Sequence, residues 1–382
     1  MTDWARMRVG GGSVSSLHCA CLAFLVASAA AGESLSVAVG RQFFNPSIGQ
    51  TIDITIGTGS KGPLVVEVLD RDRVLVRALH TVESKGSPVL ARWDGKDQDG
   101  RVVPDEAYFV RVRGSRADGP VLYDLSAGFE SKKLDASAIS YSRQEGVLSY
   151  RLPAPARVHV QVGQAIPGKS GEPNRGPVLR TLSDRRPRPA GAVIDLWNGR
   201  DDSGLVEIAS LPHFAVSILA MSLPPASILT SGNRGLSFED YVLARRGQRL
   251  QPRAMAPGVH AHHKGLHSLE DRSPQLELKQ VDSSPAVTTW RIEEGQTLQL
   301  QARLVGSTVP FFLSQPTTLY VFVDANRVAS IRCPQPSCPV EVVVPKVAPG
   351  VHFIAANWVS DFGPVAVAVQ PLEILQSGSE GR

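Results

Sequence analysis

Short segments in which apolar and polar residues alternate recur along most of the chain. Residues 51–56 read Thr-Ile-Asp-Ile-Thr-Ile, with an apolar side chain at every second position. This period is typical of a β-strand that buries one face. Further strands of this kind are expected at 64–69, 74–79, 90–93, 107–112, 147–152, 157–162, 178–182, 193–197 and 213–218. Turn residues separate them at intervals of roughly 8 to 12 positions, which favours β-sandwiches.

The periodic pattern stops at residue 226 and returns near residue 275. Between these points no period is sustained, so 226–273 is expected to be a linker, or an arm that orders on a partner. After it, strands are expected at 296–302, 319–324, 328–333, 340–344, 351–358 and 365–369. We expect these to form a further sandwich, with 328–333 and 340–344 joined as a hairpin.

One eight-residue turn occurs twice. Trp93–Gly100 reads Trp-Asp-Gly-Lys-Asp-Gln-Asp-Gly, and Trp197–Gly204 reads Trp-Asn-Gly-Arg-Asp-Asp-Ser-Gly. The strands around the two copies follow the same order, so the repeat is a whole domain. In a structural reading, the tryptophan fills the core, short Asp side chains accept backbone N–H groups, and glycines adopt positive φ. The residues concerned are Trp93, Asp94, Gly95, Asp97, Gly100, Trp197, Gly199, Asp201 and Gly204.

This pattern resembles the immunoglobulin-like (Ig-like) domain of the flagellar hook capping protein. The resemblance rests on Asn45-Pro46, the Trp-Asp-Gly turn and the spacing from Pro104 to Tyr108, and it covers 38–115 well and 146–220 less well. It implies tandem Ig-like domains in a secreted bacterial protein. In the second copy Asn198 replaces the first Asp and no Tyr occupies the position of Tyr108. If that Tyr anchors the turn, the second copy should be the looser one.

The expected fold class is therefore all-β, with tandem Ig-like β-sandwiches: two repeats of the hook-capping type and a third Ig-like sandwich. The expected boundaries are a signal peptide at 1–31, Ig-like domain 1 at 33–128, domain 2 at 129–225, a basic and His-rich linker at 226–273, domain 3 at 274–376 and a polar tail at 377–382.

The N-terminus indicates export. Arg6 and Arg8 precede an apolar run from Leu17 to Val26 and small residues up to Gly32, which is the order of a secretory signal peptide cleaved after Ala29 or Ala31. A buried N-terminal strand is the alternative. The apolar run is too short to span a bilayer stably, so no transmembrane segment is expected after cleavage.

Composition and charge limit the function. Hydrophobic residues at 42% and charged residues at 20% describe a globular chain, and 34 Gly and 28 Pro favour turns over long helices. The net charge of +4 is too small to indicate nucleic acid as a partner.

Only Cys333 and Cys338 remain after signal cleavage. In an oxidising compartment we expect them to form a disulfide that pinches a turn between two strands. A metal site at these cysteines is the alternative, but it needs two further ligands that the neighbouring sequence does not provide.

Two motifs suggest ligand-binding sites, but the spacing or the neighbouring sequence argues against each. Asp94, Asp97 and Asp99 suggest calcium, yet their spacing is not that of an EF-hand loop and its twelfth position is Asp105. Residues 163–170 match the phosphate-binding P-loop pattern, but the following Gly- and Pro-rich 171–177 cannot begin a stable helix. Structural roles are preferred for both, with calcium kept as a weak alternative and no cofactor expected.

The linker carries the strongest candidate chemistry. Four imidazoles close in sequence could bind Zn²⁺, Cu²⁺ or Ni²⁺, and they belong to His260, His262, His263 and His267. Four arginines precede them and suit an anionic polymer or a membrane surface, or form a solvated linker: Arg245, Arg246, Arg249 and Arg253.

No catalytic set is apparent. Sequence motifs of serine hydrolases, zinc proteases and glycosidases are missing, and the remaining histidines are expected to be half-exposed strand residues: His80, His159, His213 and His352. The aromatic residues Trp290, Trp358 and Tyr320 could form a platform for sugars but are better explained as core.

The sequence thus predicts a non-catalytic, exported structural, adhesion or assembly protein. It would lie in the periplasm, at the cell surface or outside the cell, and bind other envelope or extracellular proteins through its sandwiches. The alternatives are a ligand-binding accessory protein, for polysaccharide or metal, and an enzyme with a non-standard site.

Overall fold

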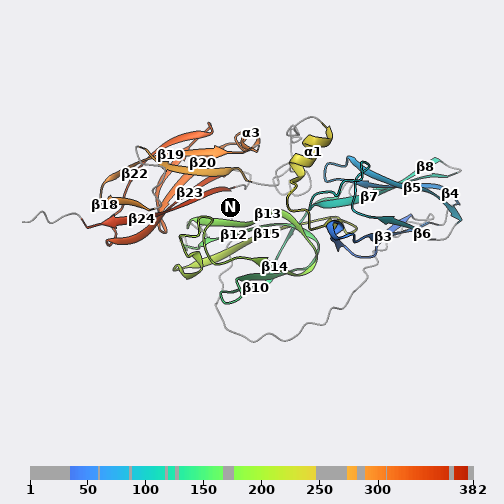
Figure 1. The fold of residues 1–382 in the computed structure, drawn as a ribbon, viewed down its shortest axis with the longest axis horizontal. Helices are drawn as coiled ribbons and strands as arrows, with labels where there is room; N and C mark the ends of the chain where they lie inside the picture. Colours follow the sequence, from blue (N-terminus) through green and yellow to red (C-terminus); the bar gives the residue numbers. More distant parts are fainter. Residues whose placement is uncertain are drawn as a thin grey trace, which may run out of the picture.

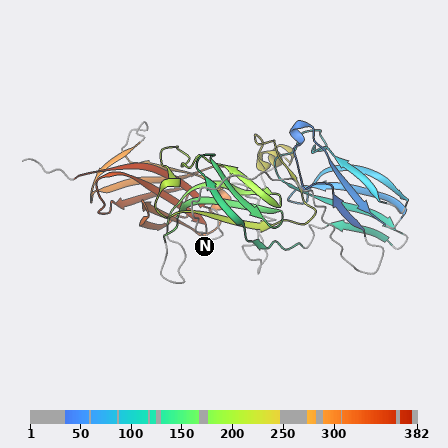
Figure 2. The same cartoon turned by 90° about the horizontal axis from the view of Figure 1, so that it is seen from below.

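Three β-sandwiches lie in a row, as Figures 1 and 2 show from two directions. The computed structural model describes residues 35–58, 61–85, 88–116, 119–124, 129–166, 176–246, 273–281, 289–306, 308–360 and 365–376. The expected all-β class with tandem Ig-like sandwiches is confirmed. The first sandwich is blue to cyan in Figure 1, the second green, and the third orange to red.

The first sandwich (domain 1) packs a three-stranded sheet against a six-stranded one. The small sheet has the order β1 (Ser36–Val39), β3 (Ile52–Gly57) and β6 (Val89–Trp93). The large sheet has the order β2 (Phe43–Phe44), β16 (Ile228–Thr230), β7 (Ala107–Arg116), β4 (Lys61–Leu69) and β5 (Leu75–Lys85), with β8 (Gly119–Asp124) paired to β7. Ile52, Ile54 and Ile56 are buried between the sheets, which confirms the alternation read from 51–56.

Domain 1 is completed by residues that follow the second sandwich. Strand β16 pairs in parallel with β2 and antiparallel with β7, and helix α1 (Phe238–Arg246) places Phe238, Tyr241 and Val242 in the core of domain 1. These elements belong to the segment that we expected to be a linker, so that expectation is wrong for 228–246. The partners of β16 are distant in the sequence, so local periodicity does not reveal them.

The second sandwich (domain 2) also has two sheets. One has the order β10 (Ser137–Ser142), β11 (Val147–Leu152) and β14 (Gly191–Leu196); the other has the order β13 (Val178–Arg188), β12 (Ala156–Gln164), β15 (Phe214–Ser222) and β9 (Lys133–Leu134). Every residue of β12 is buried, including the polar ones. Both faces of this strand are therefore covered, which a sandwich alone would not explain.

The third sandwich (domain 3) follows the same plan. Its sheets have the orders β17 (Gln275–Gln280), β19 (Thr297–Val305), β22 (Ser337–Val343), and β18 (Trp290–Glu293), β24 (Val365–Leu375), β23 (Gly350–Ser360), β20 (Thr317–Val323), β21 (Asn326–Arg332). Short helical turns occur at η1 (Pro46–Ile48), η2 (Ile208–Ser210) and α3 (Val309–Phe312). Strands β21 and β22 pair with different sheets, so the hairpin expected there is wrong: the chain crosses from one sheet to the other.

Candidate functional site at the turns and domain junctions

The first Trp turn is built from backbone hydrogen bonds. Trp93 is fully buried, and its Nε1 donates to the carbonyl of Lys96 at 2.9 Å. One carboxylate oxygen of Asp97 accepts the N–H groups of Asp99 and Arg101, each at 3.0 Å. Gly95 has a φ of 70°, and a Cβ there would lie 2.3 Å from the Cβ of Pro46. The turn therefore has the geometry expected if its tryptophan, aspartates and glycines have structural roles.

Tyr108 contacts this turn through both its hydroxyl group and its ring. Its hydroxyl donates to the carbonyl of Pro104 at 3.0 Å, and its ring meets Trp93 edge-on with centroids 5.2 Å apart. Burial raises the pKa of Tyr108 well above its ordinary value, so the phenol remains a neutral donor.

The carboxylates of this turn face arginines. Asp97 is fully buried, and its second oxygen lies 3.3 Å from the hydroxyl of Tyr241, which donates to it. Each carboxylate lies within 4.0 Å of a guanidinium nitrogen: Asp94 of Arg77, Asp97 of Arg245 and Asp99 of Arg101. Among the described residues, no cluster of His, Cys, Asp and Glu is arranged to hold a metal ion. The geometry supports a structural interpretation of these residues.

The second turn repeats this design. Trp197 Nε1 donates to the carbonyl of Arg200 at 2.7 Å, Asn198 accepts the N–H of Arg200 at 3.1 Å, and Asp201 accepts the N–H of Val206 at 2.8 Å. Gly199 and Gly204 have φ values of 80° and 75°.

An aromatic ring still packs on the second tryptophan. Tyr141, from β10, lies with its ring centroid 4.8 Å from that of Trp197. The absence of a residue equivalent to Tyr108 therefore does not leave this turn without a ring, and the looser second copy stays a prediction.

A buried ion triad joins domains 1 and 2. Glu106, which precedes β7, accepts Arg157 of β12 through both carboxylate oxygens at 2.5 and 3.2 Å, and Arg71 at 3.3 Å. The exposed fractions of these side chains are only 2 to 6%. Arg71 also lies 4.1 Å from the ring centroid of Phe238 on α1, which therefore helps to enclose the triad.

The two chain crossings between these domains run side by side. Strand β9, which enters domain 2, pairs with β15, which leaves it. Lys132 and Ser222 exchange two further bonds at 2.8 Å, from Ser222 N–H to the Lys132 carbonyl and from Lys132 N–H to the Ser222 hydroxyl. A small apolar cluster fills the junction and contains Ala107, Phe109, Leu223 and Leu229. The junction is thus packed rather than a solvated linker.

Domain 3 docks on domain 2 through the outer face of β23. Ile354, Ala356 and Trp358 face the core of domain 3. The alternating Phe353 and Ala355 instead join the core cluster of domain 2, together with Phe322 from β20. Both faces of β23 are therefore buried, and the continuous apolar run at 351–358 is the sequence signal that could have revealed this contact.

Asn357 makes the most specific contact at this junction. It is 4% exposed, its Oδ1 accepts the N–H of Val178 at 2.8 Å, and its Nδ2 donates to the carbonyl of Val178 at 2.7 Å. One side chain thus satisfies both backbone groups of a residue in another domain. Sequence analysis missed it, as it missed Glu106 and Arg157; for Asn357, the available signal was a polar residue inside an apolar strand.

His159 belongs to a second polar contact. Its Nδ1 lies 2.9 Å from Asp184, which also accepts the N–H of Ser273 at the start of domain 3. His159 is 6% exposed, so the expectation of a half-exposed strand histidine is wrong for it. Despite the burial of Asp184, its bonds to His159 and Ser273 and the nearby charge of Arg185 lower the pKa of the Asp184 carboxyl. His213 is exposed, whereas the side chain of His80 lies outside the described residues.

His352 bridges two acceptors within domain 3. Its Nδ1 lies 2.6 Å from Asp324 and its Nε2 lies 2.8 Å from the carbonyl of Ala348. Both partners accept hydrogen bonds only, so the protonated imidazolium fits this setting best. Burial acts to lower the pKa of His352, but the bonds to Asp324 and Ala348 outweigh it and raise the pKa.

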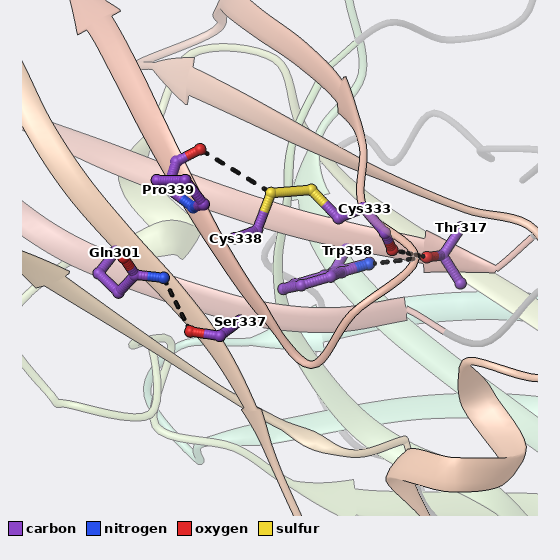
Figure 3. The surroundings of a disulfide bond; sticks show 7 residues. All are labelled: Gln301, Thr317, Cys333, Ser337, Cys338, Pro339 and Trp358. Carbon is purple, nitrogen blue, oxygen red and sulfur yellow. Dashed lines mark hydrogen bonds between the residues drawn. A yellow bond between two sulfur atoms is a disulfide. The ribbon is translucent and has the colours of Figure 1, made fainter.

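Cys333 and Cys338 form the expected disulfide, with Cα atoms 6.1 Å apart. Figure 3 shows the tryptophan of β23, Trp358, beside it: the indole N–H donates to Thr317 at 3.0 Å, and Thr317 donates to the carbonyl of Cys333 at 2.7 Å. Because β21 and β22 lie in different sheets, the disulfide ties the two sheets of domain 3 together.

The arginine and histidine candidates of the expected linker are not gathered into one site by the described residues. Arg245 lies on α1, 3.1 Å from the hydroxyl of Tyr241 and from the carbonyl of Leu75, so it stabilises domain 1. Arg246 ends α1. The other candidates lie outside the described residues and stay predictions: Arg249, Arg253, His260, His262, His263 and His267.

The remaining candidates are the P-loop-like segment and the aromatic residues considered for sugar binding, and their positions in the fold explain them. Gly163 lies within β12, where a Cβ would be 2.1 Å from the carbonyl oxygen of Pro177, so close backbone approach explains this glycine. Trp290 and Trp358 are buried at 4 and 0%, so neither can form a platform for sugars. Tyr320 is partly buried against the core cluster of domain 2.

Edge strand β14 presents an apolar row to solvent. Ile194 and Leu196 are 63 and 80% exposed, and β14 has a strand on one side only in its sheet. The N–H of Trp197 donates to the carbonyl of Gly146, the residue just before β11. By the alternation of an antiparallel ladder, the backbone groups of Ile194 and Leu196 then point toward the free edge.

No helix in the described part of the chain has the length and apolar character needed to cross a bilayer. No family model matches the sequence, and no curated protein matches it. The hook-capping resemblance therefore remains an expectation, whereas tandem Ig-like sandwiches are established by the fold.

Several solved structures of repeat proteins are similar to this chain only at a low level. A structure concerning host cell surface retention of a 1.5-MDa bacterial ice-binding adhesin is 10% identical, with 90% of this chain and 99% of that chain covered and a TM-score of 0.18. The tetra-tandem repeat in the extending region of a large adhesion protein is 14% identical, with coverages of 90% and 74% and a TM-score of 0.18. The central fibronectin-III array of RIM-binding protein is 13% identical, with coverages of 90% and 96% and a TM-score of 0.17. At these TM-scores the whole chains do not superpose, and the likeness carries no conclusion about function.

Proposed function

We propose that this chain is a non-catalytic, exported structural or assembly protein. It holds three Ig-like sandwiches in a fixed arrangement and binds other envelope or extracellular proteins through their exposed strands. The observation that carries this proposal is that buried, specific contacts join the sandwiches at both junctions, through Glu106 at one and Asn357 at the other.

The ion triad supports the proposal that the chain holds its sandwiches in a fixed arrangement. Burying Arg71, Glu106 and Arg157 costs desolvation free energy, and such groups contribute little net stability compared with well-packed apolar residues. Their geometry, however, allows one relative position of the two domains in which all three charges are paired. Domains that moved freely relative to one another would not keep this contact.

The free edge of β14 supplies a surface for a partner. Natural edge strands are usually protected by charges, prolines or bulges, and the outward positions Ile194 and Leu196 carry none of these. A partner with an extended strand could add to β14 through backbone hydrogen bonds and cover both apolar side chains. Export rests on the signal-like N-terminus, and the Cys333–Cys338 disulfide suits an oxidising compartment.

The test is site-specific photo-cross-linking in the producing cell. A photoreactive residue at position 196 should cross-link to one defined envelope or extracellular protein. The matched control is position 48, because Ile48 is 70% exposed but belongs to η1 rather than to an edge strand. No cross-linked species at 196, or the same species from both positions, contradicts the proposed surface. Turnover of a model ester, peptide or glycan by the purified chain contradicts the non-catalytic assignment.

A further inference from the structure

Strand β13 has one edge that no strand of its own sheet occupies. It is the first strand of the order β13, β12, β15, β9. The carbonyl of Pro177 accepts the N–H of Gln164 on β12 at 3.1 Å. By alternation, the N–H and carbonyl of the next residue, Val178, point away from β12, toward the free edge.

Asn357 of domain 3 occupies this edge as a neighbouring strand would. Its amide accepts from the Val178 N–H and donates to the Val178 carbonyl, at 2.8 and 2.7 Å. An adjacent strand would supply the same pair of bonds from its backbone. An Asn side chain ends in an amide that also has an N–H donor and a carbonyl acceptor, so it can imitate a strand without extending the sheet.

The contact is closed to water. Asn357 is 4% and Val178 is 6% exposed, and Phe353 and Ala355 beside them belong to the core cluster of domain 2. Because the unmade bonds of a buried backbone group are costly, loss of the Asn357 amide would leave the edge either unsatisfied or open to another partner.

We propose that domain 3 shields the β13 edge of domain 2 from pairing with the same edge of a second copy, and that Asn357 is the clamp. An exposed strand edge is a template for pairing with another chain. Every copy carries an identical β13, so two opened edges can pair antiparallel about a two-fold axis into one self-complementary interface. Domain 3 belongs to the same chain, so its high effective concentration keeps the edge closed in the intact protein. This inference does not depend on the proposed binding partner.

The test uses the full mature chain and the variants Asn357→Ala, Asn357→Asp and Asn326→Ala. Asn326 is the matched control because it is an exposed Asn of the same domain. In N357A, amide hydrogen exchange at Val178 should become about tenfold faster, and β12 should remain protected. In N357D, the carboxylate still accepts from the Val178 N–H but cannot donate to its carbonyl. An intermediate exchange rate is expected, and this variant keeps the shape of Asn if N357A does not fold.

The second readout is the sedimentation coefficient over a range of protein concentrations. N357A should form dimers as concentration rises, whereas the unsubstituted chain and N326A remain monomeric. Adding T181K to N357A places a charge on β13 and should restore the monomer. Unchanged exchange at Val178 in folded N357A and N357D overturns the clamp. Faster exchange with a monomer at every concentration overturns the shielding of the edge.

Discussion

Tyr108 and Tyr141 pack against the two repeated tryptophans but differ at their hydroxyl groups. The Tyr108 hydroxyl donates to Pro104, whereas the Tyr141 hydroxyl is buried without a hydrogen-bond partner among the described residues. A made bond adds roughly 1 kcal/mol, and a buried hydroxyl without a partner costs free energy. The same chemical change should therefore have different effects at the two sites.

Replacing Tyr108 with Phe should lower the free energy of unfolding of domain 1 by about 1 kcal/mol, because the Pro104 carbonyl keeps Thr230 as a second donor. Replacing Tyr141 with Phe should leave domain 2 unchanged or slightly more stable. Differential scanning calorimetry of the two variants measures both effects. Equal losses in Y108F and Y141F would show that the hydroxyl contacts differ from those described.

His352 makes the stability of domain 3 dependent on pH. Its pKa is raised above the ordinary value of 6.5, so the folded state binds the proton more tightly than the unfolded state. This contribution is fully present below pH 6.5 and is lost as the pH rises through the folded-state pKa. Chemical unfolding at a series of pH values between 5 and 9 should show this decline, and H352N or D324N should flatten it. An unchanged pH dependence in both variants contradicts the prediction.

Among the elements, β16 and α1 were not predicted from the sequence. Alternation located most strands of domains 1 and 2, because each of them carries its own apolar face. Strand β16 has only three residues, and its partners β2 and β7 lie far away in the sequence. No local pattern records such pairing, so this segment was interpreted as a linker.

The same limit explains the cysteine segment. Spacing was sufficient to predict the Cys333–Cys338 bond, but the strands on either side of it pair with different sheets. Which sheet a strand joins depends on contacts across the domain. The spacing of two cysteines therefore predicted a disulfide correctly and a hairpin wrongly.

Helix α1 yields a direct test of the corrected domain boundary. Phe238 is 2% exposed in the core of domain 1, so Phe238→Ala should lower the free energy of unfolding of that domain by about 3 to 5 kcal/mol. Leu243→Ala is the control, since Leu243 lies on the same helix but is 40% exposed, and it should change stability by less than about 0.5 kcal/mol. Urea unfolding followed by amide exchange in β6 measures this. If 228–246 were a linker, F238A would have no effect.

At the scale of the whole molecule, the junctions decide what the three sandwiches can do. Glu106 and Arg157 pair at the first junction, and Val178 and Asn357 pair at the second. These four residues come from segments that local sequence patterns treat as separate domains. The individual sandwiches were predictable because each repeats a local pattern, whereas the contacts that hold them together depend on single polar residues that no local pattern singles out.

We propose that these contacts hold the sandwiches in one fixed arrangement. Spin labels at positions 90 and 343 place a probe on domain 1 and on domain 3, since Leu90 and Val343 are each 59% exposed. Cys333 and Cys338 are joined to each other, so only the introduced cysteines react. Pulsed electron paramagnetic resonance should give a single narrow distance distribution in the otherwise unsubstituted mature chain, and a broad one after Arg157→Met or Asn357→Ala. A broad distribution before either substitution would contradict the account.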